Sequence, residues 1–407
     1  MKLIILFTFI FFFAQHDTIA SCNINGPNEI LEKIKRHHPE IKVNDAQKEI
    51  LQQSVSIAGM RPNPELDAEA NIADTSTGNI YTAGLSLKHT FEIGGKRNSR
   101  IKVAESLLKT GMANAETKNT DAIIDSVLRL HRLRQVHELI PIYEESLQSF
   151  NKILKLLRRG KLLSPEQQVE RETLGLAVND YKLKIAQLVS EKLNLNKHLS
   201  FFMGEKCQIP FSSLPNLTKL ANVSLNGINV DKNSKLKAAK SQLEFANSTL
   251  ELEKSKSYPN IQIGPTFEYQ KASFTHSNSF GIALRMDLPI FSSNGPGKAR
   301  AQKQIAASQK ILENIRIESE LDIEAWIAKY KQYRHSLNTI ADKKKLERKH
   351  RRIEALFKRG VISTALVIES HRQLTEFFTT RFEFEIGAVE ALWNIYKLSG
   401  EINNKKL

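Results

Sequence analysis

The sequence predicts a mainly α-helical protein with a small β part, arranged as two structural repeats. Long runs rich in Ala, Glu, Lys, Leu and Gln contain few glycines and prolines, 18 and 12 of 407 residues, which is typical of long packed helices. Four segments of about ten residues alternate apolar and polar side chains, as strands do. The order of helix, two strands, long helix, tip and return helix occurs twice, about 200 residues apart, and this indicates a duplicated domain.

The N-terminus has the pattern of a secretory signal peptide. Lys2 precedes the apolar stretch Leu3–Ala14, and Thr18-Ile19-Ala20 places small residues at the usual cleavage positions, so we expect cleavage after Ala20. No later segment reaches about eighteen apolar residues, so no transmembrane helix is expected in the mature protein.

Cys22 and Cys207 are the only two cysteines, and two fates are open to them. Ile19-Ala20-Ser21-Cys22 resembles a bacterial lipobox, although the polar segment 15–17 separates it from the apolar stretch. In an exported protein Cys22 could instead form a disulfide with Cys207 and tie the N-terminus to the middle of the chain. Lipidation and pairing of Cys22 exclude each other.

The first repeat begins with a predicted helix over Ile30–Met60, which Pro39 interrupts. The segment 61–64, Arg-Pro-Asn-Pro, ends this helix, because proline stops a helix and pushes its predecessor into extended geometry. Glu65–Asp74 and Ile80–Ile93 then alternate, and the polar residues between them predict a β-hairpin.

A very long helix is predicted to follow Gly94-Gly95 and to continue to about Leu157. At 1.5 Å per residue it would span roughly 90 Å, and Pro141 is expected to bend it. Arg158-Arg159-Gly160 ends this helix, and Ser164-Pro165-Glu166 starts the return helix. The pattern predicts a helical hairpin with a tight basic tip.

The second repeat follows the same order. Its predicted elements are a helix over Asp231–Ser257, a strand over Ile261–Tyr269, a strand over Ser279–Ile290, one long helix over Lys298–Phe357, a tip at Lys358-Arg359-Gly360 and a return helix over Ser363–Leu398. The predicted domains are a signal peptide over 1–20, a first repeat over 21–203, a linker over 204–230, a second repeat over 231–400 and a tail over 401–407.

The strand Ser279–Ile290 has one apolar and one charged face. Its apolar side chains alternate onto one side: Phe280, Ile282, Leu284, Met286, Leu288 and Ile290. Arg285 and Asp287 fall on the other side, and Glu268 belongs to the polar face of the preceding strand. A strand of this length spans a bilayer core, so the pattern predicts part of a membrane β-barrel with these charged residues in its lumen.

Four strands cannot close a barrel alone, and an open sheet edge in lipid leaves backbone groups unpaired. Closure therefore requires several copies, and three chains would give twelve strands around a lumen. Soluble hairpins packed on a helical bundle are the competing interpretation, but four strands of matched length that each lead into a long helix favour the barrel.

Composition and motifs argue against nucleic-acid binding and catalysis. The formal net charge of +15 is spread over helix faces among Glu residues, without a nucleic-acid motif. The eleven histidines form no recognisable ligand set, and no Ser/His/Asp motif is present. Gly295-Pro296-Gly297-Lys298 lacks the spacing of a phosphate loop. We expect no enzyme activity, no cofactor and no metal site.

The ordered motifs resemble the TolC family of outer-membrane efflux ducts over nearly all of the mature chain. The matching segments are Asn63-Pro64-Glu65-Leu66, Phe91-Glu92-Ile93-Gly94-Gly95-Lys96-Arg97, Leu288-Pro289-Ile290-Phe291 and the tips at Gly160 and Gly360. Gly94-Gly95-Lys96-Arg97 is most similar to the heavy-metal branch, the CzcC-like proteins. The resemblance implies a homotrimeric duct with a β-barrel in the outer membrane and an α-helical barrel in the periplasm. It also implies a periplasmic adaptor and an inner-membrane pump of the RND type as partners, and cations or small toxic compounds as cargo.

The resemblance also implies roles for the two tips. Arg158, Arg159 and Gly160 in the first tip, and Lys358, Arg359 and Gly360 in the second, are expected to meet the adaptor. Glu166 and Glu369, just beyond the tips, are candidates for an acidic ring at the closed aperture that attracts cations. The alternative function is a periplasmic coiled-coil adaptor or scaffold that does not enter the membrane.

Overall fold

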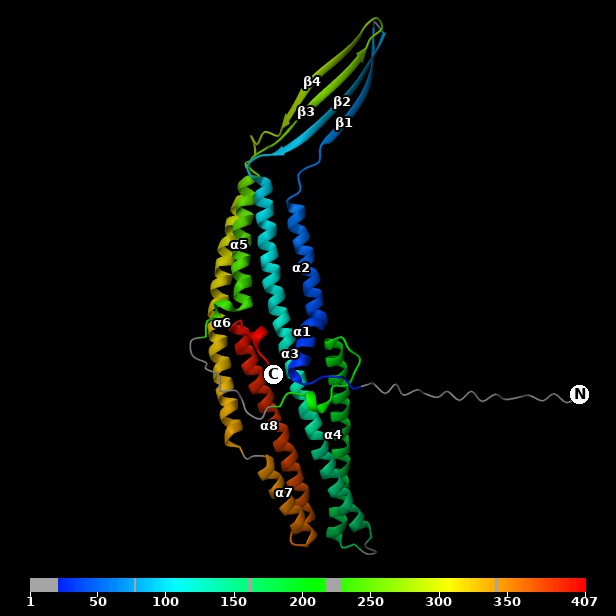
Figure 1. Cartoon of the computed structure of the whole chain (residues 1–407), viewed down its shortest axis with the longest axis vertical. Coiled ribbons are helices and arrows are strands. Elements are labelled where there is room, and N and C mark those ends of the chain that lie inside the picture. The colour runs from blue at the N-terminus through cyan, green and yellow to red at the C-terminus, as the bar shows by residue number, and fades with distance from the viewer. Residues whose placement is uncertain (1–20, 77, 160–162, 217–227, 341–342) are drawn as a thin grey trace, which may run out of the picture.

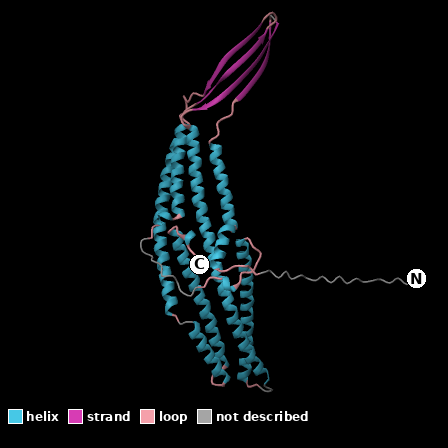
Figure 2. Ribbon diagram, viewed as in Figure 1, coloured by secondary structure: helices cyan, strands magenta, loops and turns pink. Residues whose placement is uncertain are grey.

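The computed structural model describes residues 21–76, 78–159, 163–216, 228–340 and 343–407. The predicted signal peptide, residues 1–20, and Gly160 of the first tip lie outside these ranges. The molecule is elongated, with a β-sheet at one end and helices over the rest of its length (Figure 1). The strands and the helices occupy separate parts of the molecule (Figure 2).

The helices and strands follow the predicted order with two differences described below. Their bounds are α1 Pro27–His37, α2 Pro39–Ala58, β1 Glu65–Thr75, β2 Gly78–Glu92, α3 Lys96–Arg159, α4 Pro165–Met203, α5 Ser234–Ser255, β3 Asn260–Lys271, β4 His276–Met286, α6 Gly295–Thr339, α7 Lys343–Lys358 and α8 Thr364–Leu398, with short 3-10 turns at Phe211–Ser213, Val230–Lys232 and Ile402–Asn404.

Local sequence signals explain most of the helix ends. His38 separates α1 from α2, and its Nδ1 accepts a hydrogen bond from the Glu40 backbone N–H at 3.2 Å. Ser164 and Gln167 form a reciprocal capping box at the start of α4, and Ser363 caps α8. Gly204 ends α4 in the left-handed conformation that glycine adopts without strain.

The four strands form one antiparallel sheet in the order β1-β2-β3-β4. The register places apolar residues beside one another in rows, such as Leu66 beside Leu87, Leu85 beside Phe267 and Phe267 beside Phe280. Gly264 lies so close to β2 that an added Cβ would fall 1.8 Å from the Leu87 carbonyl oxygen. The sheet is therefore a single surface in which each face has one chemical character.

The helices form two overlapping layers along the molecule. Near the sheet, α2 packs on α3, α3 on α5 and α5 on α6, whereas farther away α4 packs on α3, α3 on α8 and α8 on α7 (Figure 1). The largest buried apolar cluster joins α3, α4 and α8 and includes Leu133, Phe150, Tyr181 and Phe378. Helix α3 runs through both layers and is the central element of the helical part.

Two predictions about the second repeat were wrong. The single helix predicted over Lys298–Phe357 is divided, because α6 ends at Thr339 and Ile340 has extended backbone angles. Asn338, Thr339 and Ile340 are three successive residues of low helix propensity, and this explains the position of the break. The strand predicted to reach Ile290 ends at Met286, where β3 no longer supplies a partner because Pro259 has no backbone N–H.

Candidate channel wall and hairpin ends

One face of the sheet is apolar and exposed along its length. Phe280 is 83% exposed, Leu284 68% and Leu66 70%, which are high values for large apolar side chains. No helix covers either face of the sheet (Figures 1 and 2). Water disfavours a contiguous apolar surface of this kind, so the face has the properties of a surface that contacts lipid or another protein.

The opposite face is polar and carries charged side chains. Lys88 lies 2.6 Å from the Asp67 carboxylate, and Ser86 donates to the same carboxylate at 3.2 Å. Glu268 and Arg285, both predicted on sequence to line a lumen, lie on this face and border a hollow over the strands. Asp287 follows the last residue of β4 and lies outside the sheet.

The two outer edges of the sheet have no strand beside them among the described residues, because β1 and β4 each pair on one side only. The unpaired backbone groups of an edge strand readily accept another strand. An apolar face, a polar face and two free edges are the features of a barrel segment that needs further copies to close.

The junction between the sheet and the helices is fixed by two arginines that the sequence pattern did not identify. Arg97 donates to the Gly59 carbonyl at 2.7 Å, and Arg100 donates to the carbonyl of Met60 at 3.1 Å. Arg100 also forms a bidentate ion pair with Glu92 at the end of β2. Arg100 therefore joins the ends of α2 and β2 to the start of α3. The Gly-Gly-Lys-Arg motif points to this junction, but the identity of the partner carbonyls depends on the tertiary structure.

The two helical hairpins end together at the far end of the molecule from the sheet (Figure 1). Arg158, Lys358 and Arg359 are exposed there, and α3 ends at Arg159. Gly360 has φ of +70°, so this tight turn requires a residue without a side chain. The tip residues predicted on sequence thus lie at one end of the chain, except Gly160, which is outside the described residues.

Polar groups join the helices near these ends. The Ser149 hydroxyl of α3 donates to the Glu354 carboxylate of α7 at 2.7 Å. Buried His371 of α8 lies 2.9 Å from the Ser146 hydroxyl of α3. Burial raises the pKa of Tyr181 in α4 to about 12, so its phenol stays protonated.

The two aperture candidates have different surroundings. Glu369 forms an ion pair with Arg372 at 2.8 Å and accepts from Gln373 at 2.7 Å, and the Arg372 hydrogen bond lowers the pKa of this carboxyl. Glu166 is exposed in the first turn of α4, where the partial positive charge of the helix end favours a carboxylate. Both residues lie close to a hairpin end.

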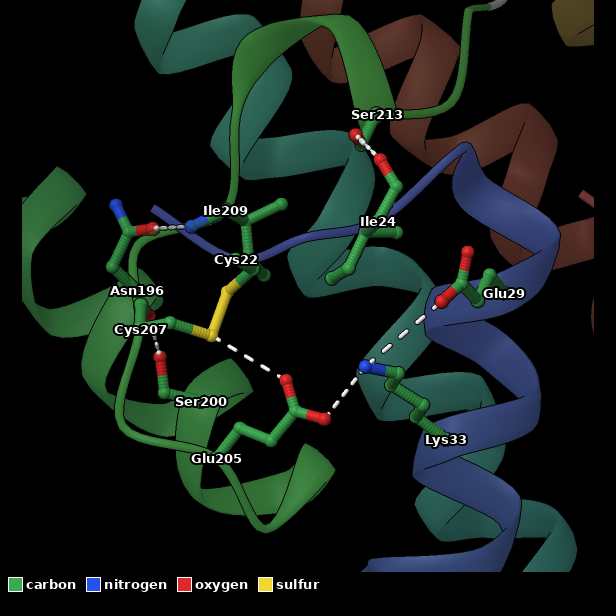
Figure 3. Close-up of a disulfide and its surroundings, with 10 residues drawn as sticks. All are labelled: Cys22, Ile24, Glu29, Lys33, Asn196, Ser200, Glu205, Cys207, Ile209 and Ser213. Atoms are coloured by element: carbon green, nitrogen blue, oxygen red, sulfur yellow. Dashed lines mark hydrogen bonds and ion pairs between the residues drawn. A yellow bond between two sulfur atoms is a disulfide. The ribbon is translucent and has the colours of Figure 1, made fainter. Parts of the chain in front are cut away.

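Cys22 and Cys207 form a disulfide with a Cα–Cα distance of 5.0 Å (Figure 3). Of the two fates that the sequence left open, the structure contains the disulfide. The bond joins the segment before α1 to the segment after α4, beside the middle of the helical part (Figure 1). Glu205 lies next to the disulfide and pairs with Lys33 of α1 at 2.6 Å, an arrangement that the sequence pattern did not predict.

None of the described helices carries an apolar stretch long enough to cross a membrane.

Comparison with known proteins identifies the fold. No family model matches the chain. The nickel-cobalt-cadmium resistance protein NccC of Alcaligenes xylosoxydans xylosoxydans is 21% identical over 264 residues, which are 63% of this chain and only 59% of that relative's length.

Solved outer-membrane channels superimpose on nearly the whole chain. The open state of the MtrE outer membrane channel of Neisseria gonorrhoeae has a TM-score of 0.71 at 14% identity and covers 92% of this chain and 90% of that one. The CmeC outer membrane channel of Campylobacter jejuni has a TM-score of 0.74 at 13% identity, with 92% and 85% covered. The outer membrane protein VceC of Vibrio cholerae has a TM-score of 0.67 at 15% identity, with 92% and 95% covered. The TolC-like fold predicted from the sequence is confirmed, and the proteins that share it are channels rather than enzymes.

Proposed function

We propose that this chain, which has the TolC-like fold, is the outer-membrane exit duct of a tripartite efflux system and has no catalytic activity of its own. The observation that carries the proposal is the isolated sheet with one apolar face, one polar face and two free edges. The similarity to a nickel-cobalt-cadmium resistance protein supports cations as cargo, with small toxic compounds as the second class.

Three chains closing head to tail give a wall of twelve strands, since each contributes a four-stranded sheet. The free elements agree on the direction of closure, because β1, α2 and α4 lie along one side of the chain and β4, α6 and α7 along the other (Figure 1). A ring in which each copy meets the next in this way has no remaining sheet edge.

Exposed apolar side chains on the edge helices support the same closure. Val43, Ile50 and Ile57 of α2 are 56%, 65% and 62% exposed and follow one another at intervals of seven residues. Val169, Leu176 and Leu183 of α4 repeat the same interval and are also exposed. A seven-residue repeat of apolar side chains is the pattern of a helix that packs against another helix.

In this ring the apolar sheet face contacts outer-membrane lipid and the polar face lines the lumen. Glu268 and Arg285 lie in the wall of the barrel, and Asp287 lies at its junction with the helices. The helices extend into the periplasm, where Glu166 and Glu369 contribute to an acidic aperture that favours cations. The domain division predicted from the sequence, with repeats over 21–203 and 231–400, accounts for the two hairpins and their helices.

The hairpin ends are the proposed docking surface for a periplasmic adaptor, which connects the duct to an inner-membrane pump of the RND type. Arg158, Arg159 and Gly160 form one docking tip, and Lys358, Arg359 and Gly360 form the other. Their exposure and basic charge suit a partner with acidic groups. The alternative, a periplasmic adaptor or scaffold, is not favoured because such a protein has no use for a free sheet of bilayer-spanning length.

Cysteine cross-linking between the two sheet edges tests the duct. One variant series places cysteines along β1, at Ala68, Ala70 or Ala73, together with Ala283→Cys in β4, and keeps the native disulfide. Intact cells treated with a short bifunctional thiol reagent are expected to yield cross-linked dimers and trimers in the outer-membrane fraction for at least one pair. Each single-cysteine variant is the control. A product that is a soluble periplasmic monomer in every pair would contradict the duct and favour the adaptor.

A further inference from the structure

We propose that Cys22, Cys207 and Glu205 form a binding site for a soft divalent cation, of the Zn²⁺ and Cd²⁺ class, when the disulfide is reduced. The site lies beside the middle of the helical part, away from the sheet and the hairpin ends. It does not depend on the proposed duct function. The sequence indicated no metal site, because Cys22 is 185 residues away from Cys207 and the two meet only in the folded chain.

The three side chains supply a suitable set of ligand atoms. Their sulfur and carboxylate atoms all lie within 4.8 Å of one another, and Glu205 Oε2 is 3.6 Å from Cys207 Sγ. Two thiolates and one carboxylate are ligands that Zn²⁺ and Cd²⁺ accept, with the fourth position left to water. A disulfide sulfur has no proton to donate, so the carboxylate gains no hydrogen bond from facing it. A bound cation gives this placement of Glu205 a chemical role.

Glu205 is already oriented by a second residue. Its Oε1 accepts from Lys33 Nζ at 2.6 Å, which leaves Oε2 directed towards the sulfur atoms (Figure 3). Lys33 in turn lies 3.9 Å from Glu29. Carboxylates that bind metals are commonly held by a hydrogen bond on the other oxygen, and this contact fixes their direction.

Backbone contacts keep the two cysteines opposite each other without the S–S bond. The two segments and α4 are joined by the hydrogen bonds Cys22 N to Gln208 O at 2.8 Å, Ser213 Oγ to Ile24 O at 2.9 Å, Ile209 N to Asn196 Oδ1 at 3.3 Å and Ser200 Oγ to Cys207 O. Cys22 is buried, whereas Cys207 and Glu205 are half-buried and accessible from solvent. Reduction therefore leaves a preformed pair of thiols that a cation can reach.

The exchange of the covalent bond for a metal bond balances in two steps. Two thiol equivalents of a reductant deliver two electrons and two protons to the S–S bond, which gives two cysteine thiols and one oxidised disulfide of the reductant. The cation then displaces the two thiol protons and binds both sulfur atoms. The cation replaces the disulfide as the link between the segments before α1 and after α4.

Cadmium titration of the full-length chain in detergent tests the site. The protein is reduced with a phosphine, freed of reductant without air and titrated with Cd²⁺ alone, while the ultraviolet sulfur-to-cadmium charge-transfer absorption is recorded. We expect one cadmium per reduced chain and no such band for the oxidised chain. Glu205→Gln is expected to weaken binding about tenfold or more, since loss of a ligand or its support has effects of this size. Glu29→Gln is the matched control, because it changes the environment of Lys33 without removing a ligand.

Several outcomes would overturn the site. The absence of the band in the reduced chain would do so, and so would equal cadmium affinity of the reduced chain and of Cys22→Ser or Cys207→Ser. Equal affinities of the Glu205→Gln and Glu29→Gln variants would remove Glu205 from the site and contradict the proposal in its stated form. If a cysteine variant does not fold, as judged by its circular dichroism, the comparison of these two glutamine variants decides whether the site exists as proposed.

Discussion

The long descending helix of the first repeat is continuous, whereas its counterpart in the second repeat is broken. Helix α3 runs unbroken for 64 residues and contains Pro141. The corresponding stretch of the second repeat contains no proline within α6 beyond its first turn, and yet it divides after Thr339 into α6 and α7.

The difference between the two helices is one of burial. Leu130, Leu133 and Val136 of α3 are fully buried, because α3 has packed helices on several sides. Helix α6 lies at the edge of the layer, and its residues Asn338 and Thr339 are exposed. A proline inside a helix costs about 3 kcal/mol, which packing of this extent offsets, whereas an exposed edge helix ends at a run of weak helix formers. Helix continuity in this protein follows packing more closely than it follows proline.

Truncation of the α3 core is expected to have the largest effect on this comparison. Leu133→Ala removes a fully buried side chain and should lower the free energy of unfolding by roughly 2–5 kcal/mol. Leu321→Ala in α6 removes a side chain that is 61% exposed and should change that free energy by about 0.5 kcal/mol or less in the separated chain. Denaturant unfolding followed by circular dichroism measures both. Equal losses would show that burial does not distinguish the two helices.

The α3 core also predicts a pH dependence of stability. Burial lowers the pKa of His131 to about 4, below the ordinary value of 6.5, so the folded chain holds this histidine neutral. Because the unfolded chain binds the proton more readily, stability is present above pH 6.5 and is lost as the pH falls from 6.5 to 4, by about 3 kcal/mol at most.

Unfolding of the His131→Gln variant between pH 7 and pH 4 measures this contribution, and its stability should fall less steeply with acid than that of the parent chain. His335→Gln replaces an exposed histidine of α6 and serves as the control. A parallel loss of stability in the parent and in His131→Gln would show that other groups dominate acid unfolding.

The contact between α7 and α3 should contribute a smaller amount. Ser149→Ala removes the hydroxyl that donates to Glu354, and a hydrogen bond to a charged group contributes about 1.5–3 kcal/mol. Hydrogen exchange should become faster in α7 while the exchange of α3 around Leu133 is unchanged. Ser126→Ala is the matched control, since this hydroxyl bonds only to the Ala122 carbonyl of its own helix. Faster exchange in both variants would indicate general destabilisation of α3 rather than loss of this contact.

The sequence predicted those features that depend on local periodicity or on turn residues. Alternation at every second residue identified the apolar and polar sheet faces, including Leu284 and Arg285 on opposite sides, and Gly360 marked a turn that needs positive φ.

Features that depend on contacts between distant segments could not be predicted in this way. Periodicity cannot place Arg100 against the carbonyl of Met60 or bring Glu205 to the disulfide, because the partners are separated by whole helices. The fate of Cys22 was open for the same reason. The unbroken helix predicted over Lys298–Phe357 failed because apolar spacing continues through Leu337 and Ile340, whereas the backbone there responds to exposure and to low propensity.

Restoring helix propensity at this break is the smallest expected effect and the most direct test of the comparison. Asn338→Ala combined with Thr339→Ala adds about 1 kcal/mol of helix propensity at two exposed positions. If propensity at an exposed edge decides the break, exchange of the backbone amides around Ile340 should slow roughly fivefold. The reverse change, Ala122→Gly in buried α3, should leave that helix continuous, because its neighbours hold it on several sides. Exchange around Ile340 that stays unchanged would mean that the break is imposed by packing on α8 rather than by the local sequence. The two long helices would then differ in their tertiary contacts alone.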